Sequence, residues 1–85
     1  MTCDYINVLN LAKDGEWDKA HQLVQSHSDE WSCLIHAYLH RVEGDLSNAK
    51  YWYDRAGSNM PGNTLDEELE RLYILVEGSS INSGC

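Results

Sequence analysis

The fold is decided by residues 30–56, which read EWSCLIHAYLHRVEGDLSNAKYWYDRA. In the first half of this stretch, large apolar residues recur every three or four positions, as they do on one face of an α-helix. These residues are Trp31, Leu34, Ile35, Tyr38, Leu39 and Val42. Gly44 then interrupts the pattern, and a second apolar face follows, made of Leu46, Ala49, Trp52, Tyr53 and Ala56. The stretch therefore predicts two antiparallel helices joined by a tight turn at Gly44.

The same periodicity predicts three more helices. Two of them span about residues 4–13 and 16–25, with a turn at Gly15, and the last begins after Thr64, which can form a capping box with Glu67. Residues 15–20 and 44–49 share one order of residue types, which indicates two similar hairpins. We expect an all-α fold of about five helices, in which two stacked antiparallel hairpins are covered by a C-terminal capping helix that ends at Gly78. Residues 1–78 would form a single helical domain, and residues 79–85 a flexible tail.

The second hairpin resembles the tetratricopeptide repeat, a helix-turn-helix unit that stacks into a solenoid. The matching positions are Ala37, Gly44, Asp45, Leu46, Ala49, Tyr53, Ala56 and Pro61. Cys33, His36 and His40 depart from the repeat, which prefers Trp, Leu and Tyr there. The run HAYLHR at residues 36–41, with the EGD, NA and YWY that follow it, is also similar to a run in small uncharacterised microbial proteins. This second resemblance implies a fold and no activity.

Composition excludes several classes of function. The 85 residues include 14 acidic and six basic side chains, for a net charge of −8, which argues against binding to nucleic acids or anionic membranes. No apolar stretch is long enough to cross a bilayer, and the N-terminus does not read as a secretory signal. The three cysteines are widely spaced, which is typical of free thiols in a reducing compartment. We therefore expect a cytoplasmic protein with no cofactor.

Polar residues gather around the turn between the two central helices. His36 and His40 are four residues apart, so both side chains lie on one face of their helix, and such a pair can bind a metal ion. Cys33 is the third weak metal candidate, but we favour a structural role for the histidines and expect no metal. Arg41 or His40 would then form an ion pair with Glu43, Asp45 or Asp54. The candidate binding residues are His36, His40, Arg41, Glu43, Asp45, Asn48 and Tyr51.

These patterns favour a protein- or peptide-binding helical adaptor, because stacked hairpins offer grooves to partners. The alternative is a small ligand-binding domain or an enzyme that uses the corner of His36, His40 and Glu43. No enzyme motif is present, so an enzyme is the weaker interpretation. A homodimer through an exposed apolar face is a further expectation, since two and a half repeats bury little core. The acidic side chains near the start of the last helix would form a solvated face. They are Asp66, Glu67, Glu68 and Glu70.

Overall fold

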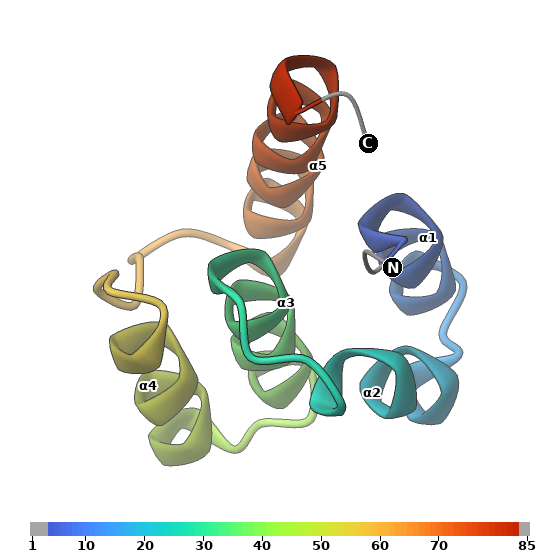
Figure 1. Ribbon diagram of the computed structural model, residues 1–85. Helices are drawn as coiled ribbons and strands as arrows, with labels where there is room; N and C mark the ends of the chain where they lie inside the picture. Colours follow the sequence, from blue (N-terminus) through green and yellow to red (C-terminus); the bar gives the residue numbers. More distant parts are fainter. Residues whose placement is uncertain (1–3, 84–85) are drawn as a thin grey trace.

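The computed structural model describes the backbone of residues 4–83 and the side chains of residues 4–78. The described residues form five α-helices and no strand (Figure 1). The helices are α1 (Tyr5–Lys13), α2 (Trp17–Gln25), α3 (Glu30–Val42), α4 (Leu46–Arg55) and α5 (Leu65–Ser83). The prediction of an all-α fold with about five helices is confirmed. None of the helices in this part of the chain is long and apolar enough to cross a membrane.

Helix α3 forms the centre of the molecule, with α4 on one side and α2 on the other (Figure 1). It also contacts α1 and α5, so the nine consecutive residues 32–40 are all buried. Among the described helices, α4 packs along α3 alone. The apolar core draws on all five helices and consists of Val8, Leu9, Ala20, Val24, Leu34, Ile35, Ala37, Tyr38, Leu39, Ala49, Tyr53, Leu72 and Val76.

Short-range contacts fix where the helices begin. The carboxylates of Asp4, Asp29 and Asp45 each accept a hydrogen bond from the backbone N–H three residues later, which caps α1, α3 and α4. At the start of α5, Thr64 and Glu67 exchange hydrogen bonds of 2.9 and 3.1 Å, so the predicted capping box is confirmed. These caps place the four helices α1, α3, α4 and α5 within a residue or two of their predicted starts.

The two similar turns share one backbone conformation. Gly15 has a φ of +85° and Gly44 a φ of +86°, the left-handed region in which glycine carries no steric cost. Each turn allows the chain to reverse directly from one helix into the next. The helical hairpins predicted around these two glycines are therefore present.

Three expectations about individual residues are wrong. Helix α5 does not end at Gly78 but continues to Ser83. Gly78 does not have a positive φ, and a glycine inside a helix costs only about 1 kcal/mol relative to alanine. Val42 and Leu46 were expected on apolar faces, yet they flank the Gly44 turn and are exposed. Glu68 was expected in solvent and is completely buried.

Candidate functional site

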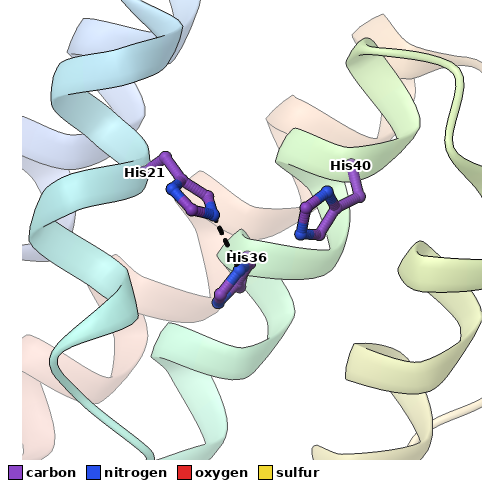
Figure 2. Close-up of side chains that lie close together, drawn as sticks. All are labelled: His21, His36 and His40. Atoms are coloured by element: carbon purple, nitrogen blue, oxygen red, sulfur yellow. Dashed lines mark hydrogen bonds between the residues drawn. The ribbon is translucent and has the colours of Figure 1, made fainter.

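Three histidines from two helices meet beside the centre of the fold (Figure 2). His36 and His40 lie on successive turns of α3, and His21 reaches them from α2. The Nε2 atoms of His21 and His36 are 3.0 Å apart, and one ring nitrogen from each histidine lies within 4.8 Å of the others. His36 is 5% exposed and His40 is 7% exposed, whereas His21 is half-buried. We call these three residues the histidine cluster.

Tryptophan rings enclose the histidine cluster from both sides. Trp17 of α2 stacks on His21 with a centroid separation of 4.6 Å, and Trp52 of α4 stacks on His36 at 4.0 Å. The ring of His21 stands nearly perpendicular to that of His36, at 89°. A continuous series of rings thus links α2, α3 and α4, and Trp17 also donates a 2.7 Å hydrogen bond to the carbonyl of Leu39.

Neighbouring groups determine the protonation of the cluster. Burial, followed by the nearby His21 and His40, lowers the pKa of His36 to about 4, so its ring is neutral at pH 7. Burial and His40 also lower the pKa of His21. The tautomer of His40 follows from geometry, because its Nδ1 lies 2.5 Å from Oε1 of Glu43. A carboxylate only accepts, so Nδ1 carries a proton and Nε2 of a neutral His40 has the free lone pair.

The structure brings together only part of the predicted corner. His36, His40 and Glu43 lie together, and the expected pairing of His40 with Glu43 is present. One carboxylate oxygen of Asp45 also lies within 4.8 Å of a carboxylate oxygen of Glu43 and a ring nitrogen of His40. Asp45 and Asn48 form a hydrogen-bonded pair, in which Asp45 accepts from both the backbone N–H and the side-chain amide of Asn48. These two residues therefore serve the cap of α4.

Cys33, Arg41 and Tyr51 lie apart from the histidine cluster. The Sγ of Cys33 lies 3.7 Å from the carbonyl oxygen of Ser28, near the start of α3. Tyr51 is exposed on α4. Of the two basic residues expected to pair with an acid of this corner, His40 does so, whereas the guanidinium of Arg41 donates to the side-chain and backbone oxygens of Asn63.

Sequence reasoning missed His21 as a member of the site. A signal was present, since His21 lies four residues after Trp17 and on the same face of α2 as the buried Ala20 and Val24. A histidine on an apolar helix face needs a polar partner when buried. The partner proved to be His36 on a different helix, 15 residues away in the sequence.

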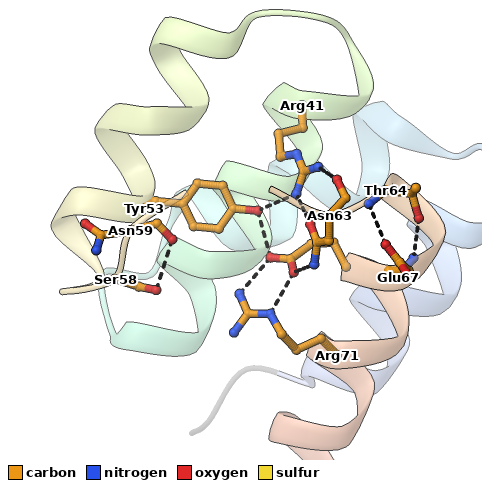
Figure 3. Close-up of polar contacts among 9 residues, drawn as sticks. Arg41, Tyr53, Ser58, Asn59, Asn63, Thr64, Glu67 and Arg71 are labelled. Carbon is orange, nitrogen blue, oxygen red and sulfur yellow. Dashed lines mark hydrogen bonds and ion pairs between the residues drawn. The ribbon is translucent and has the colours of Figure 1, made fainter. Parts of the chain in front are cut away.

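A second buried polar cluster surrounds Glu68 of α5, which is 0% exposed. Its carboxylate accepts hydrogen bonds from Tyr53 at 2.7 Å, from Asn63 at 3.0 Å and from Arg71 at 2.7 and 2.9 Å. Figure 3 shows Arg41, Tyr53, Asn63 and Arg71 close together, and the guanidinium of Arg41 donates to the Tyr53 hydroxyl and to Asn63. Burial raises the pKa of Glu68, but the three donors outweigh it and lower the pKa overall. Because every group is satisfied internally, we interpret this cluster as structural.

Comparison with known proteins does not assign the chain to a family: no protein-family model, no curated protein and no solved structure matches it. A function must therefore be argued from the geometry of the side chains.

Proposed function

We propose that this protein binds a protein or peptide partner through the outer surface of α4. The observation that carries the proposal is the exposure of Tyr51, a large aromatic side chain that is 51% exposed on a helix packed along α3 alone. A helix with one covered side leaves the opposite side free for a partner. Leu46, at the start of the same helix, is also exposed, at 56%.

Neighbouring residues hold Tyr51 in place. Its ring meets the half-buried Trp52 edge to face, with centroids 5.2 Å apart. The guanidinium of Arg55 lies 5.8 Å from the centre of the Tyr51 ring and 5.3 Å from that of Trp52, and it donates a hydrogen bond to the Tyr51 hydroxyl. Tyrosine, tryptophan and arginine are the residues that most often carry binding energy at protein interfaces. Their prior ordering reduces the entropy lost on binding.

Partner binding at α4 has more support than catalysis by His36, His40 and Glu43. Both histidines are almost completely buried, and Trp52 covers the face of His36. An organic substrate would have to displace this ring stack to reach an imidazole nitrogen. The surface of α4 needs no such rearrangement.

Partner capture by wild-type protein and by Tyr51→Ala and Arg55→Ala variants tests the proposal. Each captured protein is then purified and its Kd measured by calorimetry. We expect each substitution to weaken binding by about tenfold or more, as interface anchors do. The matched control is Ile74→Ala, which removes another exposed apolar side chain, on α5, and should leave Kd unchanged.

Two results decide whether α4 binds the partner. A partner that binds the Tyr51→Ala and wild-type proteins equally well would contradict the role of α4. Analytical ultracentrifugation tests whether the partner is a second copy of the chain. A concentration-dependent dimer that Tyr51→Ala dissociates would then support the proposal.

A further inference from the structure

We propose that His21, His36 and His40 form a binding site for one divalent transition-metal ion that prefers nitrogen ligands, with Zn²⁺ as the representative ion. This proposal is independent of partner binding at α4, because it uses none of the side chains exposed there. It rests on the positions of the three imidazoles and on the hydrogen bond between His40 and Glu43.

The spacing of the ring nitrogens suits a metal ion. Zn²⁺ binds imidazole nitrogens at about 2.0–2.1 Å in tetrahedral geometry, which separates two ligand nitrogens by roughly 3.3 Å. The Nε2 atoms of His21 and His36 are already 3.0 Å apart, and one ring nitrogen from each of the three histidines lies within 4.8 Å of the others. Binding of an ion would require the side chains to rotate to the required spacing. Two ligands come from adjacent turns of α3, so the rigid helix fixes their relative position.

The protons can be arranged without placing a charge on any imidazole. Between His21 and His36, one Nε2 carries a hydrogen and the other accepts it. For both Nε2 atoms to bind a metal, the donating ring must transfer that proton to its own Nδ1, through solvent, and it stays a neutral imidazole. Each Nε2 lone pair then forms one bond to the ion.

Glu43 orients the ring of His40, as carboxylates commonly orient histidines that bind a metal ion. By accepting the Nδ1 proton at 2.5 Å, it orients the ring and leaves Nε2 as the ligand atom. Glu43 is therefore a positioning residue rather than a ligand. Its charge, together with the net charge of −8 of the chain, also favours a cation at this place.

The ligand types define the class of metal. Three nitrogen donors suit Zn²⁺, Cu²⁺, Ni²⁺ or Co²⁺, whereas Mg²⁺ and Ca²⁺ prefer oxygen ligands. Three protein ligands also leave a fourth tetrahedral position, which a water molecule would fill. A metal ion is small enough to enter between the rings, which an organic ligand is not.

Metal titration of the full chain tests the proposal. Protein freed of metal with a chelator is titrated with Zn²⁺ in competition with a chromophoric chelator, and Co²⁺ is added separately to record its visible absorption bands. We expect one Zn²⁺ per chain and the intense bands of tetrahedral Co²⁺. Mg²⁺ at millimolar concentration should not compete.

Variants then locate the site. His21→Ala changes the least buried histidine of the cluster and should weaken Zn²⁺ binding at least tenfold, while circular dichroism shows that the helices remain. The matched control is His27→Ala, which removes the fourth histidine, between α2 and α3 and outside the cluster, and should leave the affinity unchanged. Glu43→Gln should weaken binding several-fold while the stoichiometry stays at one.

Two outcomes would overturn the proposal. One is wild-type protein that shows no saturable binding up to millimolar Zn²⁺, in which case the cluster is only a packing feature. The other is binding that survives in folded His21→Ala protein, since the ion would then be held elsewhere, for instance by cysteines. If His36→Ala fails to fold, the results for His21→Ala and Glu43→Gln still decide the question.

Discussion

The hydroxyl of Tyr53 on α4 donates a 2.7 Å hydrogen bond to Oε2 of Glu68 on α5, and both side chains are completely buried. The helices themselves do not pack against each other. This bond therefore links two helices that are separated in space by α3 and in sequence by a loop. Arg41, at the end of α3, holds the same loop through Asn63, so one polar cluster ties α3, α4 and α5 together.

Loss of the buried carboxylate should destabilise the protein strongly. Glu68→Ala leaves the Tyr53 hydroxyl and the Asn63 amide without their acceptor, and Arg71 without its ion-pair partner. We expect the free energy of unfolding to fall by about 3 kcal/mol, in line with the loss of one partner from a buried polar cluster. Urea denaturation followed by circular dichroism measures the change. Glu70→Ala, an exposed acid of the same helix, is the control and should change stability by less than about 0.5 kcal/mol. Equal effects of the two substitutions would mean that the cluster contributes nothing.

Substitution of Gly44 should destabilise the protein even though a side chain would fit there. A Cβ added at Gly44 meets no atom within 4 Å, so the only penalty comes from the φ of +86°. We expect Gly44→Ala to cost about 1–2 kcal/mol of stability, the price of a left-handed conformation for an L-residue. Gly62 also has open space around it and lacks a positive φ, so Gly62→Ala should be nearly neutral. Thermal melts of both variants test this difference, and similar melting temperatures would show that backbone strain is not the cause.

Helix α5 should be required for a stable monomer. It supplies Leu72 and Val76 to the core and covers parts of α1 and α3. Removal of residues 64–85 would expose that apolar surface and also delete Glu68. We expect the shortened chain to aggregate or to lose cooperative unfolding, as size-exclusion chromatography and calorimetry would show. A monomeric fragment that melts at the wild-type temperature would disprove the role of α5 as a cap.

The helices could be predicted from the sequence because their signals are local. Asp29 caps a helix through an N–H three residues away, and Gly44 needs only its own φ to end one. Such contacts depend on neighbours in the sequence, and these neighbours are known without the fold. The apolar spacing of α3 adds the direction of its buried faces.

The polar clusters were harder to predict because each polar group has several possible partners. Glu68 is one acid in a run of four, and only the fold places Tyr53 and Asn63 beside it while leaving its neighbours in solvent. Three acids lie near Arg41 in the sequence, yet its side chain binds Asn63, 22 residues away. His21 joined His36 for the same reason, since the packing of α2 on α3 determines which side chains meet.

The unfolding free energy of the metal-free protein should decrease as the pH falls from 6.5 to 4. In the folded state, burial next to His21 and His40 lowers the pKa of His36 to about 4, whereas in the unfolded chain it has its ordinary value near 6.5. The unfolded state therefore binds the proton more strongly throughout this window, and stability is lost as the pH falls. The lowered pKa of His21 acts in the same direction. The difference for His36 corresponds to at most about 3 kcal/mol. Urea denaturation at several pH values, with a chelator present, measures it. His36→Phe can stack on Trp52 but cannot take up a proton, so the share of the pH dependence that His36 contributes should disappear, while His27→Ala should retain it. Wild-type stability that stays constant between pH 7 and pH 4.5 would show that the imidazole of His36 protonates in the folded protein as readily as in the unfolded chain.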